Sequence, residues 1–245
     1  MKPLEKIQFI SYWIKNYTEL MPSKAQSLVI GISGGIDSSV SSTLSAMTGL
    51  KTIVLSMPIK QKSPQHDLSL KHQEWLIKNF NNVEAQTINL DQLFETFKNT
   101  LSKFDSELGL ANSRARLRMT TLYQVAAANK AIVVGTGNKV EDFGVGFYTK
   151  YGDGGVDISP IADCNKTEVW EMGKELNILN EIIEAAPTDG LWDDGRTDEG
   201  QLGLKYSELE EAMNNPNSPN REKYEKIRKL NLHKMEPIPV CKIPN

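Results

Sequence analysis

Cysteine is scarce in this sequence of 245 residues, which contains only Cys164 and Cys241. The two lie far apart and form no CxxC pair, so a disulfide-rich scaffold is excluded. Unpaired thiols are typical of proteins in a reducing compartment. The sequence therefore predicts two free cysteines, buried or near the surface, to which we assign no chemistry.

Long apolar runs and an excess of basic charge are also missing. The opening segment MKPLEKIQF carries charges where a signal peptide needs an apolar stretch, and no run approaches the length of a membrane span. Lys and Arg number 28 against 31 Asp and Glu, a net charge of −3, unlike proteins that follow a nucleic-acid backbone. We expect a cytoplasmic protein without a membrane or nucleic-acid partner.

Strand-like and helix-like segments alternate along the first half of the chain. Short apolar runs predict strands at 27–31, 52–56, 83–90 and 131–135, and helical periodicity predicts helices at 37–47, 64–80, 91–104 and 112–129. An amphipathic helix precedes them, with an apolar face made of Leu4, Ile7, Ile10, Ile14 and Tyr17. This alternation favours an α/β fold, a parallel sheet with helices on both faces.

The second half of the chain reads differently. After the glycine-rich segment 136–160, helices are predicted at 165–177, 180–186, 207–213 and 220–231. The acidic, glycine-punctuated segment 189–200 between them is predicted to be a mobile surface loop. Because there is no internal repeat or low-complexity block, we expect residues 1–245 to form one domain with a helical C-terminal annex.

The segment GISGGIDSS at 31–39 lies where the first strand passes into a helix. Successive backbone N–H groups in such a loop, with a helix N-terminus behind them, form a site for phosphate oxygens. Asp37 alone would repel phosphates, so it indicates a bridging divalent cation. The spacing fits neither GxxxxGK[ST] nor GxGxxG. The remaining alternative is a tight turn with a serine N-cap.

The SGGIDS segment at 33–38 resembles the SGGxDS loop of the N-type ATP pyrophosphatases, which split ATP into AMP and pyrophosphate. Within that superfamily the chain resembles the ammonia-dependent NAD synthetases. The segments that carry this resemblance are NSRAR at 112–116, GT at 135–136 followed by Glu141, FYTKYGDGGVD at 147–157, NKT at 165–167, PT at 187–188 and HK at 233–234. It implies a Rossmann-like fold of the adenine nucleotide alpha hydrolase type.

The resemblance also implies roles for the matched residues. Those implied to bind ATP are Gly31, Ile32, Ser33, Gly34, Gly35, Ile36, Asp37, Ser38, Thr136, Lys166 and Thr188. Those implied to bind deamido-NAD are Arg116, Lys150, Asp157, His233 and Lys234. Asp37 and Glu141 are implied to hold Mg²⁺. Lys166 is expected to act on the phosphates and Asp153 to bind ammonium and take its proton.

Several residues keep a second interpretation. Asp153 lies in a Gly-Asp-Gly sequence and fits a turn residue equally well. Arg114 and Arg118 share a predicted helix with Arg116 and are interpreted as a solvated basic face.

The implied reaction is ATP-dependent amidation of deamido-NAD by ammonia, through an adenylated intermediate, giving NAD, AMP and pyrophosphate in the last step of NAD biosynthesis. No cysteine with glutaminase partners is visible, so free ammonia, or ammonia from another protein, is implied. A homodimer with deamido-NAD at the interface is implied as well. Two rivals remain. A tRNA-modifying pyrophosphatase is disfavoured by the missing basic charge, and a noncatalytic nucleotide sensor by Glu141 and Lys166.

Overall fold

A parallel sheet forms the centre of the computed structural model, which describes residues 1–60, 63–188, 190–192 and 196–244. Its strands are β1 (Ser27–Gly31), β2 (Lys51–Ser56), β3 (Val83–Thr87) and β4 (Ala131–Val133), in the order β3-β2-β1-β4. In the register, Gly31 pairs with Leu55 and Val29 with Val133. The carboxyl ends of all four strands therefore meet at one edge, where ligands of α/β folds bind.

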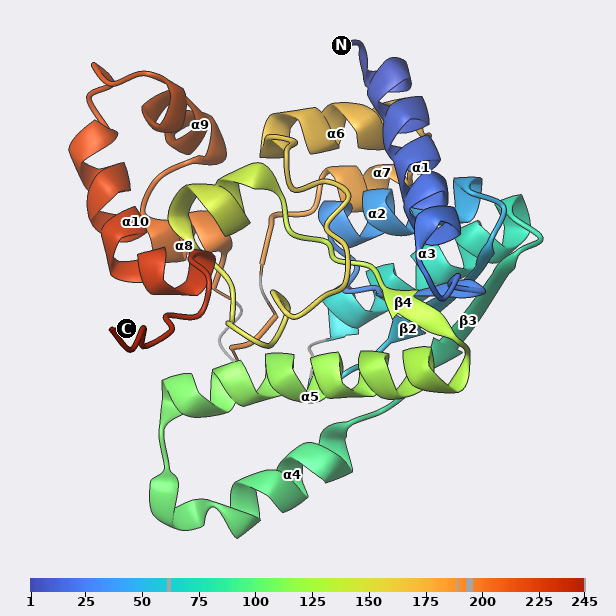
Figure 1. The fold of residues 1–245 in the computed structure, drawn as a ribbon, viewed down its shortest axis with the longest axis horizontal. Helices are drawn as coiled ribbons and strands as arrows, with labels where there is room; N and C mark the ends of the chain where they lie inside the picture. The colour runs from blue at the N-terminus through green and yellow to red at the C-terminus, as the bar shows by residue number, and fades with distance from the viewer. Residues whose placement is uncertain (61–62, 189, 193–195, 245) are drawn as a thin grey trace.

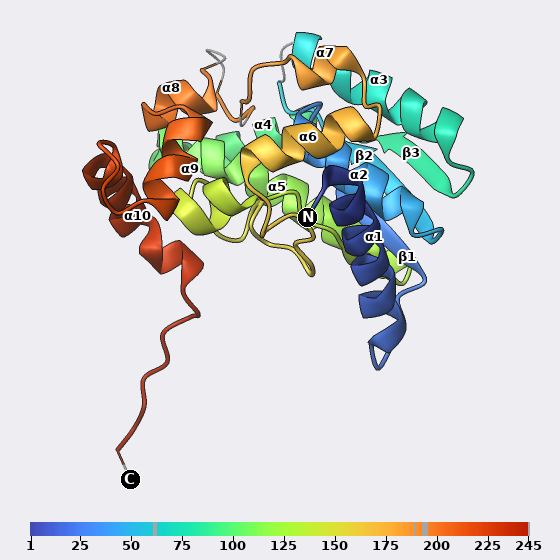
Figure 2. The same cartoon turned by 90° about the horizontal axis from the view of Figure 1, so that it is seen from above.

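Helices cover both faces of the sheet (Figures 1 and 2). One face carries α1 (Pro3–Leu20), α2 (Ile36–Met47), α3 (Ser63–Asn79), α6 (Lys166–Glu175) and α7 (Asn180–Ile183). The other carries α4 (Asp91–Thr100) and α5 (Glu107–Ala128), with the short 3-10 helix η1 (Ser102–Phe104) between them. The predicted parallel sheet with helices on both faces is confirmed.

Alternate residues of β1 explain why the strand is apolar throughout. Leu28 and Ile30 pack with Ile7 of α1 in one cluster. Val29 points to the opposite face, where it packs with Phe94 of α4. Because both faces are buried, successive side chains of a parallel strand are all apolar.

The structure corrects the predicted buried face of α1 and the predicted start of α5. On α1, Leu4 and Tyr17 are 50% and 41% exposed and were wrongly assigned to the buried face, where Thr18 lies instead. Helix α5 begins at Glu107 rather than at 112, because the hydroxyl of Ser106 accepts a hydrogen bond from the backbone N–H of Gly109. A serine in this position caps the free N–H groups of a first turn.

The glycine-rich segment contains a π-helix, η2 (Lys139–Val145), that the sequence did not predict. It packs against the annex, which consists of α8 (Asp198–Leu202), α9 (Tyr206–Asn214) and α10 (Arg221–Met235). Figure 1 shows these three helices together at one end of the sheet. Helix α8 begins inside the predicted loop 189–200, so that expectation was partly wrong; residues 189 and 193–195 lie outside the described residues.

Two further expectations concern thiols and membrane spans. Cys164 is buried and Cys241 is exposed, and both are free, as predicted. Among the residues that the structure describes, no helix is both long and apolar enough to cross a membrane.

His72 is a buried titratable group of the core on α3. Its Nε2 lies 3.0 Å from the hydroxyl of Ser42 on α2, and its ring stacks on Trp75 with centroids 5.5 Å apart. Burial lowers the pKa of His72 to about 4, against 6.5 for an exposed histidine. The imidazole is therefore neutral in the folded protein near neutral pH.

This burial predicts a pH dependence of stability. Between pH 6.5 and about pH 4 the unfolded chain binds a proton at His72 and the folded chain does not. The free energy of unfolding should therefore fall as the pH drops through this window, by up to roughly 3 kcal/mol from this residue. Urea unfolding across the window should show the fall, and His72→Gln should flatten it. His66→Gln, on the same helix, is the control; an equal slope in H72Q and the wild type would contradict the assignment.

Candidate active site

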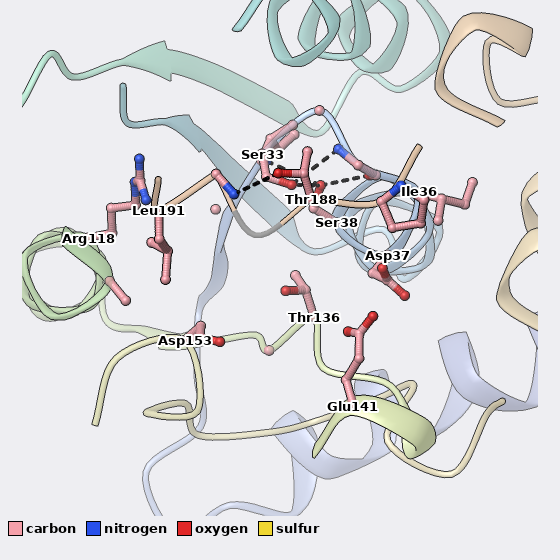
Figure 3. Close-up of a pocket in the computed structure, with 18 of the residues that line it drawn as sticks. Ser33, Ile36, Asp37, Ser38, Arg118, Thr136, Glu141, Asp153, Thr188 and Leu191 are labelled. Atoms are coloured by element: carbon pink, nitrogen blue, oxygen red, sulfur yellow. Dashed lines mark hydrogen bonds between the residues drawn. The ribbon is translucent and has the colours of Figure 1, made fainter. Parts of the chain in front are cut away.

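The loop between β1 and α2 is shaped by a glycine that no other residue could replace. Gly34 has a φ of +90°, and a Cβ there would lie 2.5 Å from the carbonyl oxygen of Gln65 and 2.9 Å from the backbone nitrogen of Ser69. The loop therefore packs closely against α3. Hydrogen bonds within the loop also hold its backbone: the N–H of Ser33 donates to Oγ of Ser38 at 3.2 Å, and Oγ of Ser38 donates to the carbonyl oxygen of Gly35 at 3.0 Å. Figure 3 shows this bracing.

Two carboxylates and one ammonium group meet beneath the loop. Nζ of Lys166 lies 2.5 Å from Oδ2 of Asp37 and 2.8 Å from Oε1 of Glu141. They come from the first turns of α6, α2 and η2, and Lys166 is only 2% exposed. Figure 3 shows Asp37 and Glu141 facing each other across the cavity. The sequence separates these residues, and the fold places a cation between the two acids.

Asn138 links the carboxylate of Asp37 to the backbone of the turn that carries Glu141. Its Nδ2 donates to Oδ1 of Asp37 at 3.0 Å, while its Oδ1 accepts from the backbone N–H groups of Val140 and Glu141, each at 3.1 Å. It is the N-cap residue of η2 and is fully buried. Sequence reasoning missed Asn138, although asparagine ahead of a helical turn is a known capping signal.

The three charges set one another's protonation. Burial raises the pKa of Asp37; the charge of Lys166 opposes the rise and that of Glu141 adds to it. Burial alone would raise the pKa of Glu141 too, but the charge and hydrogen bond of Lys166 outweigh it and lower that pKa. Burial alone would lower the pKa of Lys166, and the two acids raise it instead. Lys166 is therefore a permanent cation near neutral pH.

Tyr206 of the annex is a neighbour of this cluster that sequence reasoning did not find. Its hydroxyl donates to Oε1 of Glu141 at 2.5 Å, and its ring centroid lies 4.7 Å from Nζ of Lys166. Burial and the charge of Glu141 raise the pKa of Tyr206 strongly. The phenol thus stays protonated.

One cavity of about 410 Å³ contains the loop and the charge cluster. Its size is typical of small-molecule sites. Every residue predicted to bind ATP or metal, and both residues with a predicted catalytic role, line it: Gly31, Ile32, Ser33, Gly34, Gly35, Ile36, Asp37, Ser38, Thr136, Glu141, Asp153, Lys166 and Thr188. The structure therefore brings this predicted set together at the carboxyl edge of the sheet.

Arg114 and Arg118 do not form a solvated face, so that interpretation was wrong. Arg114 is buried, with NH1 2.5 Å from the carbonyl oxygen of Leu191 and its guanidinium 4.9 Å from the ring centroid of Phe94. Arg118 lines the cavity and donates from Nε to the carbonyl oxygen of Met57 at 3.0 Å. Figure 3 shows Arg118 on α5, at the end of the cavity away from Asp37.

Most residues predicted to bind deamido-NAD contact one another outside this cavity. Arg116 lies 3.4 Å from the carbonyl oxygen of Lys150, whose Nζ donates to the carbonyl oxygen of His233 at 2.8 Å. Lys234 donates to the carbonyl oxygen of Tyr148. These contacts join α5, the segment 146–155 and α10. Arg116 and His233 are exposed, so this part of the predicted set forms an open surface.

Asp157, the fifth residue of that set, contacts β4 and α5. Its carboxylate accepts hydrogen bonds from the hydroxyl of Tyr123 at 3.0 Å and from the backbone N–H of Val133 at 2.7 Å. Burial, together with the charge of Asp157, raises the pKa of Tyr123 to about 12. In this arrangement Asp157 secures the end of the sheet.

Asp153 lines the cavity and also fits a turn. Its Oδ1 accepts a hydrogen bond from the backbone N–H of Thr149 at 2.9 Å. Burial, and then the charge of Asp153, raises the pKa of nearby Asp142 well above its usual range. Lys234 lies close enough for its charge to oppose that rise. An acidic region thus adjoins the cavity on the side of the segment 146–155.

Comparison with known proteins identifies the family, because the model of NAD synthase matches residues 6–243. The chain belongs to the NAD synthase family. An NH₃-dependent NAD⁺ synthetase from Carboxydothermus hydrogenoformans is 38% identical over 214 residues, which are 85% of this chain and 84% of the relative. The resemblance predicted from the sequence is confirmed.

Two solved structures show how closely the NAD synthase fold is shared. The structure of NMN synthetase from Francisella tularensis has a TM-score of 0.89 at 33% identity and covers 100% of this chain and 99% of its own. The NH₃-dependent NAD synthetase from Campylobacter jejuni has a TM-score of 0.80 at 23% identity, covering 99% and 100% of the two chains, and shows the same fold. NAD synthases are ligases that form a C–N bond with ATP as co-substrate.

Proposed function

We propose that this NAD synthase amidates deamido-NAD with ammonia, consuming ATP and releasing NAD, AMP and pyrophosphate. The observation that carries the proposal is the meeting of Asp37, Glu141 and Lys166 under the glycine-rich loop, in one cavity with Thr136 and Thr188. A nucleotide sensor needs a loop that binds phosphates. A buried cluster of acids and a cation beside that loop supports phosphoryl chemistry instead.

The residues present fit a magnesium ion. Asp37 and Glu141 are hard oxygen donors that already share one cation, the ammonium of Lys166. Among the described residues no third acid, histidine or cysteine joins them. One or two carboxylates completed by substrate phosphates are the usual protein ligands of Mg²⁺. Asp37 and Glu141 would hold the ion, and when bound it would neutralise charge on the phosphates.

The first step breaks the bond between the α-phosphorus of ATP and the pyrophosphate oxygen. A carboxylate oxygen of the nicotinate group attacks that phosphorus, and pyrophosphate leaves with the bonding electrons. The backbone and hydroxyl groups of 33–38 bind the leaving pyrophosphate. Lys166 donates to phosphate oxygens from beneath. The product is an acyl-adenylate, in which AMP replaces the poor leaving group of a carboxylate.

The second step forms the amide. Ammonium first gives up one proton, ammonia attacks the activated carbonyl carbon, and AMP leaves with the bonding electrons of the broken C–O bond. The nitrogen then loses a second proton, which the departing AMP phosphate or water accepts. Asp153 lines the cavity and its charge raises the pKa of Asp142 more than that of any other residue does, and we assign to Asp153 the binding of ammonium and the acceptance of its first proton. The turn role and this assignment fall on the same side chain, since Oδ1 of Asp153 accepts the backbone N–H of Thr149.

Product analysis tests the reaction. With Mg²⁺, ATP, deamido-NAD and ammonium, we expect equal amounts of NAD, AMP and pyrophosphate. Asp37→Ala should abolish all three products, because it removes a cation ligand beneath the loop. Asp163→Asn is the matched control, since that side chain is 97% exposed and pairs only with Lys139 among the described residues. Formation of ADP, or of no nucleotide product, would overturn the proposal.

A second candidate for the substrate that is amidated is a mononucleotide instead of the dinucleotide deamido-NAD. The Francisella relative is named NMN synthetase, and its structure superposes with a TM-score of 0.89. Nicotinate mononucleotide carries the same reacting carboxylate as deamido-NAD and lacks the adenylyl half. The product assay run with each acceptor distinguishes them. A kcat/KM higher for deamido-NAD supports the dinucleotide, and the reverse order would reassign the acceptor while keeping the chemistry.

The role of Asp153 has its own test. Asp153→Asn should lower kcat/KM for ammonium about 100-fold at neutral pH, the effect expected for a lost general base. The loss should shrink as the pH rises and free ammonia replaces ammonium, while KM for ATP stays unchanged. Full rate at low ammonium and neutral pH would leave Asp153 as a turn residue.

The open surface carrying Arg116 and His233 supports a dimer. Apolar side chains are exposed near the start of α5, Phe104 at 79% and Leu108 at 61%, and Tyr151 beside Lys150 is 53% exposed. A second copy would bury such groups and complete the acceptor site. Light scattering in solution should give twice the 27.4 kDa of one chain; a monomer that is active at the same concentration would contradict this.

A further inference from the structure

We propose that Tyr206 is a positioning residue of the annex that holds Glu141 in place as a cation ligand. This inference rests on the proposed function, because it takes Glu141 to be a ligand of Mg²⁺. None of the predicted site residues lies on α9. The connection comes from the fold, which brings together two residues 65 positions apart.

The helix that carries Glu141 depends on the annex for its packing. Val140 and Val145 of η2 lie in one buried cluster with Leu209 and Tyr224 of the annex, and not in either cluster of the sheet. The carboxylate of Glu141 projects from this helix toward Asp37, which belongs to the sheet side of the cavity. The geometry of the cation site is therefore set across a boundary between two packing units.

Tyr206 lies on the same side of that boundary as Glu141 and contacts it through a single hydroxyl. It lies 2.5 Å from Oε1 of Glu141 and 3.2 Å from Oδ2 of Asp198. A hydroxyl has one proton to donate, and the shorter contact identifies Glu141 as the acceptor. Oε1 of Glu141 thus receives two hydrogen bonds, one from Lys166 and one from Tyr206. The first donor is a cation that another cation can replace, whereas the second is neutral and remains.

The ring of Tyr206 is itself fixed. It is 1% exposed and meets Trp170 edge to face, with centroids 5.9 Å apart. Its backbone N–H donates to Oε1 of Glu199 at 3.0 Å, in the first turn of α8. Helix α9 is tied in turn to the helix of Lys166, because Glu210 accepts hydrogen bonds from the backbone N–H and the hydroxyl of Thr167. The donor aimed at Glu141 therefore has little freedom to move.

The consequence is a defined effect on cation binding. Groups that hydrogen-bond a metal ligand fix its orientation, and their loss typically weakens metal binding 10- to 100-fold. Removal of the hydroxyl alone, in Tyr206→Phe, keeps the ring and its contact with Lys166. We expect the half-saturating Mg²⁺ concentration to rise by roughly 10- to 100-fold, with kcat at saturating Mg²⁺ close to that of the wild type.

The test measures binding of α,β-methylene-ATP, in which the cleaved bond is blocked, by calorimetry at a series of Mg²⁺ concentrations. Tyr206→Phe should shift the Mg²⁺ dependence, and its affinity for the analogue in EDTA should equal that of the wild type. Tyr224→Phe is the matched control, because Tyr224 is also buried in the annex but donates to the backbone oxygen of Gly144, at 3.3 Å. Thermal unfolding of both variants separates folding from cation binding.

The variant Glu141→Gln distinguishes a failure of the proposed function from a failure of the positioning role of Tyr206. If E141Q leaves the Mg²⁺ dependence unchanged, the assignment of Glu141 in the proposed function is wrong. If E141Q shifts it and Y206F does not, only the positioning role of Tyr206 is overturned. A shift of equal size in Y206F and Y224F would show a general loosening of the annex, which also overturns the role.

Discussion

The site depends on the pairing of two buried carboxylates with one ammonium. Asp37 and Glu141 both contact one cation and are therefore close enough to repel each other. Burial makes their charges costly unless they are paired. Lys166 supplies the counter-charge, and its position requires α6 to start under the loop. Removal of Lys166 would leave two buried carboxylates without a counter-charge. The first turns of α2, η2 and α6 must therefore converge on one point.

Much of this architecture could be predicted from local patterns. The strands are apolar because both of their faces are buried, and the SGGIDS segment places phosphate-binding groups where β1 ends. Residues at the carboxyl ends of neighbouring parallel strands and in the loops after them necessarily come close. For this reason the loop 31–38 and Thr136 fall in one cavity, whereas Glu141, Lys166 and Thr188 joined the predicted set through the family resemblance.

The errors concern contacts that no local pattern encodes. Arg114 reads as a surface residue in its helix, yet its partner Leu191 lies 77 positions away. Tyr206 lies just before the predicted helix 207–213 and carries no local signal of a role, and only the packing of the annex on η2 brings its hydroxyl to Glu141. Asn138 differs from these two, because its capping signal was present in the sequence and was overlooked. The roles of the acceptor residues remain predictions, since their side chains contact backbone groups rather than the cavity.

The close packing of Gly34 against α3 has a thermodynamic consequence. A loop that must fold around its ligand spends binding energy on ordering its backbone, roughly 1–2 kcal/mol for each residue fixed. Here the carbonyl oxygen of Gln65 and the braced serines already confine the chain at 33–38. That entropy is lost during folding, so the affinity for triphosphate is not diminished by it. The same confinement makes position 34 intolerant of any side chain, because the carbonyl oxygen of Gln65 belongs to the backbone and cannot yield by rotating away.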